Sequence, residues 1–415
     1  MSLHVGYLTG EYPRATDTWI QREVAGMRNR GVEITTFSIR RPGPEHVLGP
    51  EQREGQATTF YLLEHIKVGG LVSAHLRALV ASPGRYLRSL RLAWNTKRPG
   101  LRGGIYQLFY FVEAVVLAQE MTRRRIDHLH NHFGDSSCTV AMLAAEVGGF
   151  PFSFTLHGSA IFFEAHTWRI DEKIRRSAFC ACISHFARSQ AAIFAPEATE
   201  KLHIVHCGVE PHRLMAVDHR GRGPRLLFIG RITAVKGLDV LLDAIDALQS
   251  RHTDLQLTIV GDGPERTRLE QKTAQRGLDA VVTFVGSKSQ EEVSDLLTRT
   301  DVFVLPSFAE GVPVVLMEAM GAGLPVVATQ VGGMTELVDD QVSGFLIRPF
   351  DATLLAERID QLVSDPDLRR RLGQAGRKKV LDEFVSADEA GRLASLIGNH
   401  QAGVASPVRP SLPSA

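Results

Sequence analysis

Cysteine and net charge are both scarce in this chain. Only 4 of its 415 residues are cysteine, which is too few for a disulfide framework and suits a reducing compartment. The net charge is +1: residues 1–215 carry 25 Lys and Arg against 19 Asp and Glu, and residues 216–415 carry 22 against 27. Neither half has the strong basic excess of a nucleic-acid-binding protein, so we expect no nucleic-acid partner.

Long apolar runs are absent as well. The N-terminus has no basic segment followed by an apolar one, so we expect no signal peptide. The most membrane-like stretch, Ile105 to Met121, is shorter than the roughly 20 residues that a span needs, and it contains Glu113 and Glu120. With 44% hydrophobic and 22% charged residues, the chain is neither disordered nor collagen-like, and we expect a soluble cytoplasmic protein.

Short apolar runs alternate with amphipathic segments in two successive sets. The first set comprises His4–Thr9, Ile34–Ile39, His128–Phe133, Phe152–His157, Phe179–Ser184 and Leu202–Val209. The second comprises Arg225–Gly230, Leu255–Val260, Val281–Val285, Val302–Pro306, Pro325–Thr329 and Gly344–Ile347. This alternation predicts parallel strands covered by helices on both faces. The predicted fold class is therefore α/β, with two doubly wound, Rossmann-like parallel-sheet domains.

The domain boundaries follow from breaks in this pattern. We predict an N-terminal domain over 1–210, a linker over 211–224 that is rich in turn formers, and a C-terminal domain over 225–383. A terminal helix is predicted over 384–401, and the sequence leaves open whether it returns to the first domain. Residues 402–415 contain several prolines and serines and are predicted to be a disordered tail.

The most informative segment runs from Phe308 to Gly344. Glu310 precedes a predicted helix that contains Glu318, so their backbones lie about 10–12 Å apart. A retaining glycosidase pair is separated by about 5 Å and an inverting pair by about 6.5–9.5 Å, so an acid–base pair is disfavoured. The two carboxylates suit the ends of one extended ligand, with phosphates at the helix start between them. The alternative is a solvated Glu310 and a helix-dipole role for Glu318.

The turn Gly230–Gly237 connects a predicted strand to a predicted helix. It carries Arg231 and Lys236 at the sheet edge where ligands bind in such folds. A guanidinium and an ammonium group can together neutralise a diphosphate without a metal, although solvated surface charges would look the same. The later Gly261-Asp-Gly263 has Arg266 where a dinucleotide fingerprint needs its third glycine, which argues against NAD.

Histidines end or line two strands of the first set. His157 follows an apolar strand, where it suits hydrogen bonding to a sugar hydroxyl or phosphate, or simple packing at the strand end. His128, His130 and His132 alternate along one strand and face one side, but the outer pair is ~13 Å apart along the strand. Zinc ligands must converge on one ion, so we expect no metal site.

The segment from His65 to Val112 is basic and contains no acidic residue. Arg85, Arg88 and Arg91 recur at helical spacing beside apolar residues and Trp94. The full set of cations is Lys67, Arg77, Arg85, Arg88, Arg91, Lys97, Arg98 and Arg102. A basic amphipathic helix can lie on an anionic membrane surface. A solvated helix on the face of a domain is the alternative, and the sequence leaves both open.

Several of these motifs together resemble glycosyltransferase family 4, whose members are retaining nucleotide-sugar transferases with the GT-B fold of two Rossmann-like domains facing a cleft. The resemblance rests on GRITAVKG, IVGDGPE, FVGS, the Glu-x7-Glu of FAEGVPVVLMEAMGAGLPVV, and Gly332–Gly333. The chain is most similar to the bacterial exopolysaccharide, or colanic-acid-type, members. Those combine a YPR…T.I..EV segment, here Tyr12 to Val24, with H.H and LHG motifs.

The resemblance implies a role for each matching residue. Arg231 and Lys236 would bind the donor diphosphate, Glu318 the ribose and Glu310 the donor sugar. His157 would contact the transferred sugar. The remaining donor-binding positions it implies are Gly286, near the base, and the backbone of Gly311, Val312 and Val314. Two segments depart from the family pattern: Gly10–Arg14 replaces a Gly-Gly loop, and Cys207-Gly208-Val209 replaces Asn-Gly-Val.

The function implied is a retaining glycosyltransferase of hexosyltransferase type that needs no cofactor or metal. It would move a sugar from a nucleotide-diphosphate sugar to a hydroxyl of a glycan or lipid-linked acceptor in exopolysaccharide or cell-surface glycan biosynthesis. It would work in the cytoplasm, peripherally at the inner face of the plasma membrane. A nucleotide-sugar epimerase of the same fold and a non-enzymatic, membrane-docked scaffold are the alternatives. The base, sugar, acceptor, linkage and oligomeric state do not follow from the sequence.

Overall fold

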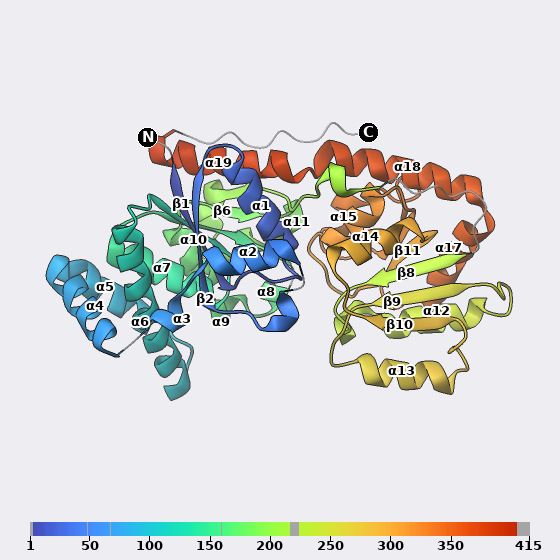
Figure 1. The fold of residues 1–415 in the computed structure, drawn as a ribbon, viewed down its shortest axis with the longest axis horizontal. Coiled ribbons are helices and arrows are strands. Elements are labelled where there is room, and N and C mark those ends of the chain that lie inside the picture. Colours follow the sequence, from blue (N-terminus) through green and yellow to red (C-terminus); the bar gives the residue numbers. More distant parts are fainter. Residues whose placement is uncertain (1–2, 48, 67, 159, 216–223, 405–415) are drawn as a thin grey trace. The chain divides into compact units, whose positions relative to one another are not determined.

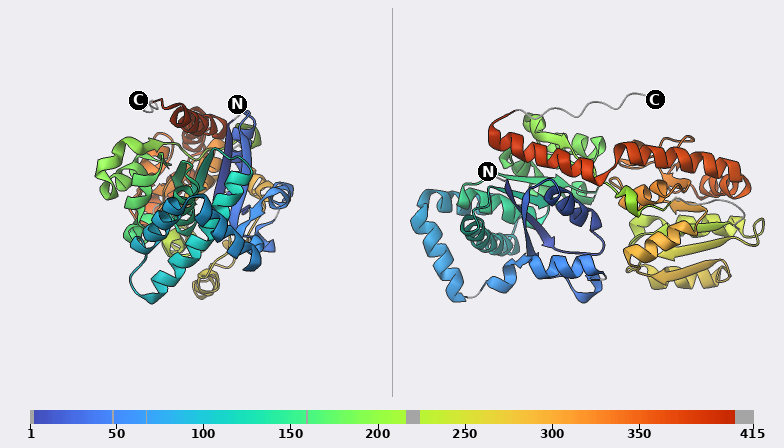
Figure 2. Two further views of the ribbon diagram at one scale, coloured as in Figure 1. Left: turned by 90° about the vertical axis from the view of Figure 1, so that its left-hand side faces the viewer. Right: turned by 45° about the horizontal axis from the view of Figure 1, so that its top comes forward.

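The computed structural model describes residues 3–47, 49–66, 68–158, 160–215 and 224–404 (Figure 1, Figure 2). The chain divides into two compact units, Met1–His206 with Ala387–Ala415, and Cys207–Ser386. We call them the N-terminal and C-terminal domains. Each is built on one parallel sheet with helices packed against it, so the predicted α/β class with two doubly wound domains is confirmed.

The N-terminal sheet has seven described strands in the order β3-β2-β1-β4-β5-β6-β7. They are β1 (His4–Glu11), β2 (Glu33–Arg40), β3 (Phe60–Tyr61), β4 (His128–His132), β5 (Phe152–Leu156), β6 (Cys180–Cys182) and β7 (Leu202–Ile204). Tyr7 at the centre of β1 pairs with Thr36 of β2 and with His130 of β4. The strand order therefore reverses between β1 and β4, which is the position where ligands bind in open parallel sheets.

The helices of this domain lie between its strands. They are α1 (Thr18–Arg28), α2 (Pro50–Thr58), α3 (Leu62–His65), α4 (Val68–Ala81), α5 (Pro83–Asn95), α6 (Leu101–Arg123), α7 (Ser136–Gly148), α8 (Ala160–Phe163), α9 (Ala165–Trp168), α10 (Ile170–Arg176) and α11 (His185–Phe194). Local sequence explains the ends of α7: the Asp135 side chain accepts a hydrogen bond from the Ser137 amide, and Gly149 closes the helix in a left-handed conformation.

Helix α6 is longer than the apolar stretch that the sequence suggested. It runs for 23 residues and, by length and composition, is long and apolar enough to cross a membrane. However, 39% of its most apolar window is buried inside the protein, and its second half packs Phe111, Val115 and Leu117 into the domain core. Burial raises the pKa of Glu113 to about 7. Helix α6 also packs against α7, as a helix in the core of a domain does.

The C-terminal sheet has six described strands in the order β10-β9-β8-β11-β12-β13. They are β8 (Arg225–Ile229), β9 (Gln256–Val260), β10 (Val282–Gly286), β11 (Val302–Leu305), β12 (Val326–Thr329) and β13 (Phe345–Ile347). Its helices are α12 (Leu238–Leu248), α13 (Arg266–Gln275), α14 (Gln290–Thr298), α15 (Val314–Gly321), α16 (Met334–Leu337), α17 (Ala352–Ser364) and α18 (Pro366–Glu383). Here the order reverses between β8 and β11.

The last helix, α19 (Ser386–Ala402), belongs to the N-terminal domain. Leu393 and Ile397 are fully buried in the same core cluster as Val5 of β1 and Met27 of α1, which lie at the other end of the chain. The backbone amide of His206 donates a hydrogen bond to the Glu389 carboxylate at 2.9 Å. Apolar side chains three and four residues apart give α19 one apolar stripe, and the N-terminal domain covers that stripe.

The two segments that lead from one domain to the other run side by side. Val209 pairs with Val385 in a parallel bridge, and the amides of Val209 and Ser386 donate to Phe384 and Val209 carbonyls at 2.9 Å each. A side chain at Gly208 would overlap the backbone of Ser386. Cys207-Gly208-Val209, one of the two segments that depart from the family pattern, therefore lies where the chain passes from one domain to the other. Most of the predicted linker 211–224, and most of the predicted tail 402–415, lie outside the described residues.

Candidate functional site

The loops that follow the strands of the C-terminal sheet are joined to one another by backbone hydrogen bonds. Each bond connects the loop after one strand to the loop or strand end beside it. The amide-to-carbonyl pairs are Gly230 to Val260, Ile232 to Asp262, Gly261 to Gly286, Phe308 to Val235, and Gly333 to Gly311, at 2.7–3.0 Å. The motifs GRITAVKG, IVGDGPE, FVGS, FAEGVP and VGG, which are separate in sequence, therefore form one continuous edge.

Glycines allow these loops to approach so closely. Gly237 has a positive φ of 66°, and a Cβ there would overlap the carbonyl oxygen of Pro306. Gly332 has a φ of 54°, and a Cβ there would overlap the carbonyl oxygen of Glu310. A Cβ at Gly261 or at Gly263 would likewise overlap a backbone carbonyl of the loop after β8. Their spacing, which looked like part of a dinucleotide fingerprint, thus serves loop packing.

Lys236 and Glu310 come together at the strand-order reversal between β8 and β11. The Lys236 ammonium group donates a hydrogen bond to Glu310 Oε1 at 2.5 Å, and only 19% and 11% of the two side chains are exposed. Arg231, on the same loop as Lys236, is exposed and makes no ion pair within the described part of the chain. The family resemblance implied contacts to different parts of one donor, the diphosphate for Lys236 and the sugar for Glu310, so their direct contact with each other is a new feature.

The segment after Glu310 leads into helix α15. Pro313 stands at the N-cap of this helix, and Val314 is its first helical residue. Glu318 lies within the helix and is buried, with 7% of its surface exposed. Gly286 ends β10 with a φ of 72°, beside Gly261. The structure thus brings Arg231, Lys236, Glu310 and the start of α15 to the same sheet edge.

In the N-terminal domain, His157 belongs to a buried chain of polar side chains. It follows β5, and its Nε2 lies 2.9 Å from Nδ1 of His132 at the end of β4. His132 Nε2 lies 3.2 Å from Glu23 Oε1, and the Tyr7 hydroxyl donates to the same oxygen at 2.8 Å. Glu23 on α1, His132 and Tyr7 were not among the predicted site residues.

The chemistry of this chain of contacts selects one arrangement of protons. His132 Nε2 makes no hydrogen bond of good geometry to any described residue, so it is the negative charge of the Glu23 carboxylate, 3.2 Å away, that favours a proton on Nε2. His132 Nδ1 is then an acceptor, and His157 Nε2 is its donor. Burial, with a smaller contribution from His132, holds the pKa of His157 well below its usual range, so this ring is neutral at pH 7. In this arrangement the remaining nitrogen of His157, Nδ1, carries no proton and can act only as a hydrogen-bond acceptor.

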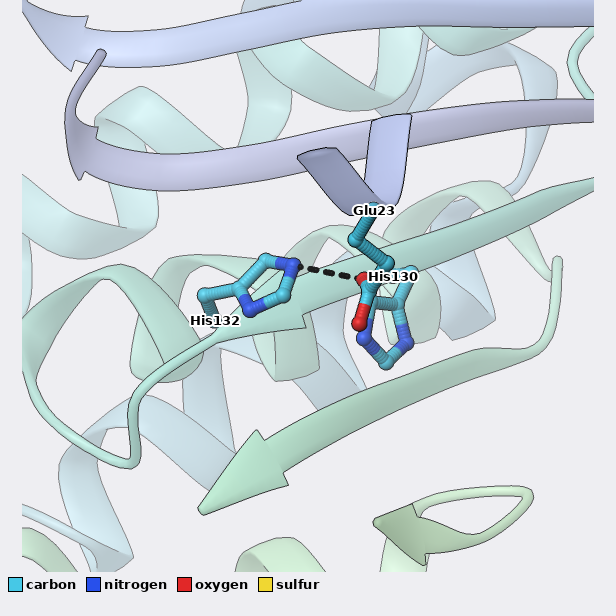
Figure 3. A group of neighbouring side chains, drawn as sticks. All are labelled: Glu23, His130 and His132. Atoms are coloured by element: carbon cyan, nitrogen blue, oxygen red, sulfur yellow. Dashed lines mark ion pairs between the residues drawn. The ribbon is translucent and has the colours of Figure 1, made fainter. Parts of the chain in front are cut away.

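Glu23, His130 and His132 also form a group whose ligand atoms all lie within 4.8 Å of one another (Figure 3). In the sequence only the histidines of one strand stand out, and Glu23 joins them from α1. Both ring nitrogens of His130 already have hydroxyl partners, Ser153 at 2.8 Å and Thr155 at 3.0 Å. His132 is likewise engaged with His157. These partners favour a hydrogen-bonded network over a metal centre.

The family model of the glycosyl transferases group 1 matches residues 216–379, which include the joined loops and α15. The C-terminal domain therefore carries the match to this glycosyltransferase family. A colanic acid biosynthesis glycosyltransferase of Salmonella typhimurium is 27% identical over 95% of this chain and 99% of its own length. An amylovoran biosynthesis glycosyltransferase of Erwinia amylovora is 36% identical over 48% of this chain and 51% of its own length.

Solved structures of glycosyltransferases share the fold of the whole chain. The sucrose-phosphate synthase of Thermosynechococcus elongatus has a TM-score of 0.74 and 18% identity over 97% of this chain and all of its own. Anabaena HepE, solved in complex with UDP-glucose, has a TM-score of 0.73 and 16% identity over 96% of this chain and all of its own. This likeness identifies the glycosyltransferase as a GT-B protein, as its motifs implied.

Proposed function

We propose that this glycosyltransferase is a retaining enzyme that uses a nucleotide-diphosphate sugar. The sugar would go to a hydroxyl of a glycan or lipid-linked acceptor in exopolysaccharide or cell-surface glycan biosynthesis. The observation that carries the proposal is the Lys236–Glu310 pair at the strand-order reversal of the C-terminal sheet. The names of the relatives, which mention colanic acid and amylovoran biosynthesis, and the UDP-glucose complex of HepE support it.

The proposed donor site has one group for each part of the donor. Arg231 and Lys236 neutralise the diphosphate, and the first amides of α15 add hydrogen bonds to it, because the first turn of a helix leaves its amides unpaired. Glu310 contacts the sugar, Glu318 holds the ribose hydroxyls, and Gly286 lies near the base. The Lys236–Glu310 contact supports this arrangement, since it brings a phosphate-binding cation and a sugar-binding carboxylate within 2.5 Å of each other.

The proposed reaction keeps the configuration of the sugar without a covalent enzyme intermediate. The bond between the anomeric carbon and the diphosphate oxygen breaks while the acceptor oxygen bonds to the same face of that carbon. The acceptor proton passes to an oxygen of the leaving diphosphate. Arg231 and Lys236 stabilise the negative charge that develops on this leaving group, so no metal is required. His157 accepts a hydrogen bond from a hydroxyl of the transferred sugar.

A donor screen tests this proposal directly. UDP-, GDP- and ADP-sugars are added to the protein in thermal-shift and turnover assays, with and without EDTA and with simple glycosides as acceptors. We expect one base to raise the melting temperature and to support transfer that EDTA does not change, giving a product whose anomeric configuration by NMR matches the donor. A product of inverted configuration would contradict the retaining mechanism. Conversion of the donor without any acceptor would indicate an epimerase.

We also propose that helices α4, α5 and α6 dock on an anionic membrane surface. These three helices pack on one another beside the N-terminal sheet (Figure 1). Large apolar side chains are exposed on all of them: Val72, Leu76 and Val80 on α4, Leu87 and Trp94 on α5, and Leu101, Ile105, Leu108 and Phe109 on α6. Exposed apolar surface combined with cations and no acidic residue between 65 and 112 suits anionic lipid at the inner face of the plasma membrane.

The structure shows which arginines should be replaced to test whether this surface binds lipid. Arg85 donates to the Gly148 carbonyl at 3.3 Å and Arg88 pairs with Glu146 at 2.8 Å, so both help hold α5 against the end of α7. Arg77 and Arg91 are exposed, and neither makes an ion pair within the described residues. We expect the double variant Arg77→Gln, Arg91→Gln to bind phosphatidylglycerol-containing vesicles about 30-fold more weakly, since each of the two cations near the surface contributes about 1 kcal/mol.

Vesicle sedimentation measures this loss. The matched control is Arg299→Gln with Arg371→Gln, which removes two exposed arginines from the C-terminal domain. Equal vesicle binding by both double variants would show that the α4–α6 surface is not where lipid binds.

A further inference from the structure

A cavity of about 200 Å³ lies within the N-terminal domain, apart from the loops of the C-terminal sheet. Its walls come from the start of α6, from α7, and from the α9–α10 region that follows His157 along the chain. A cavity volume of roughly 10–15 Å³ is enough for one water molecule. This much larger cavity therefore has room for a ligand of about the size of a sugar phosphate. Nothing in the family motifs points to it.

The charges that line this cavity are all positive. Arg98, Arg169 and Lys173 are among its lining residues, and no carboxylate is. Arg169 is compensated by Asp171 at 2.9 Å, whereas Arg98 and Lys173 form no ion pair within the described residues, although Asp135 and Asp171 act on the Lys173 charge from farther away. Lys173 is completely buried, and its ammonium group donates to the carbonyls of Gly134 and Asp135 at 2.8 Å each. An anion in the cavity would compensate these two charges.

The Arg98 guanidinium group is held in place for such a role. It stacks on the ring of Trp168, with 4.1 Å between its central carbon and the ring centroid. Stacking covers the face of a guanidinium group and leaves the N–H groups at its edge available, which is the geometry that binds phosphate oxygens. Because Trp168 also lines the cavity, the stacked pair forms one of its walls.

One buried acceptor in the cavity wall lacks a partner. Gln107 is 8% exposed, and its amide nitrogen donates to the Thr96 carbonyl at 3.0 Å. That contact identifies which atom of the side-chain amide is the nitrogen and which is the oxygen, because the Thr96 carbonyl oxygen can accept a hydrogen bond only from the nitrogen. Gln107 Oε1 is buried without a hydrogen-bond partner. Buried acceptors are rarely left unpaired, so a hydroxyl group of a ligand would satisfy this one.

We propose that this cavity binds a phosphate-bearing, hydroxyl-rich ligand, either a free sugar phosphate or the same group at the head of a lipid. Arg98 and Lys173 would bind the phosphate, and Gln107 Oε1 would accept a hydrogen bond from a hydroxyl. Trp168 would provide an apolar face beside the ring. Binding here does not depend on the proposed transfer reaction.

Tryptophan fluorescence of the full chain, titrated with glucose 1-phosphate, tests the proposal. We expect saturable quenching that the variant Trp168→Phe loses, and that Arg98→Gln weakens by about tenfold or more, because charge-assisted hydrogen bonds to phosphate are strong. The matched control Arg102→Gln, an exposed arginine of α6 outside the cavity, is expected to bind as the unmodified protein does. Gln107→Leu should weaken glucose 1-phosphate but leave inorganic phosphate unaffected.

Other outcomes overturn the proposal or identify the source of the ligand. Equal binding by Arg98→Gln and Arg102→Gln, or binding lost in Lys236→Ala but kept in Arg98→Gln, would show that the sugar phosphate binds elsewhere. Phosphatidylglycerol vesicles supply the same chemistry in a lipid. A greater loss of vesicle binding in Arg98→Gln than in Arg102→Gln would assign the cavity to a lipid headgroup, and equal vesicle binding with weakened glucose 1-phosphate would assign it to the free compound.

Discussion

Replacement of Lys236 by alanine is expected to lower kcat/KM by roughly 10²–10³, the usual effect of removing one group that stabilises developing charge. Lys236 is positioned for this by the loop after β8 and by its 2.5 Å contact with Glu310. The loss should fall mainly on kcat, because the charge on the diphosphate increases as the bond to the sugar breaks. Steady-state kinetics with the donor found in the screen gives the value.

The variant also removes the partner of a largely buried carboxylate, so stability has to be separated from catalysis. Glu310 would be left without its 2.5 Å contact, which destabilises the fold as well. Urea unfolding of Lys236→Ala and of the double variant Lys236→Ala, Glu310→Gln measures this effect. Lys288→Ala, a surface lysine of the same domain, is the control. A folded Lys236→Ala protein with unchanged kcat/KM would contradict the assignment.

Replacement of Glu23 by glutamine is expected to lower kcat/KM by roughly 10–100-fold, although Glu23 is a positioning residue that does not itself contact the sugar. The carboxylate orients His132, and His132 orients His157 through the 2.9 Å contact between their rings. A neutral amide no longer selects the His132 tautomer, so the acceptor nitrogen of His157 is presented for only part of the time.

A double-mutant cycle distinguishes this role from a merely structural one. If Glu23 acts through His157, Glu23→Gln should cost little further activity once His157 is already alanine. Glu33→Gln, an exposed carboxylate of the same domain, is the control and should leave activity unchanged. Equal penalties for Glu23→Gln with and without His157 would mean that Glu23 supports the fold and does not position the histidine.

The sequence could predict that the loop motifs of the C-terminal domain lie at one sheet edge, because the information it carries is local. Each loop motif follows a strand, and parallel strands bring all such loops to one sheet edge. Arg231, Lys236, Glu310 and the start of α15 can therefore be assigned to one place from their sequence positions. The 74-residue separation of Lys236 and Glu310 hides their direct contact, since no local pattern indicates which side chains of two neighbouring loops meet.

The buried histidine network of the N-terminal domain was predicted only in part. His157 stood out at a strand end, whereas Glu23 looks like any polar residue of an amphipathic helix. Its partner His132 is more than a hundred residues away in sequence, and the two meet because β4 lies beside β1 in the strand order. The polar lining of the cavity, from Arg98 to Lys173, was hidden in the same way among residues that suited a solvated surface.

Sequence alone determined the class of fold, the two domains and the chemistry of the loops, because hydrophobic periodicity and glycine-rich turns act over short stretches of chain. Tertiary structure alone decided which distant side chains share a site. It also decided that α19, the last helix, packs beside β1 and α1, the first elements. The physical reason is that burial stabilises any apolar stripe whose shape fits the surface it covers, wherever in the chain the stripe lies. The spacing of residues in the sequence does not show which surface that is.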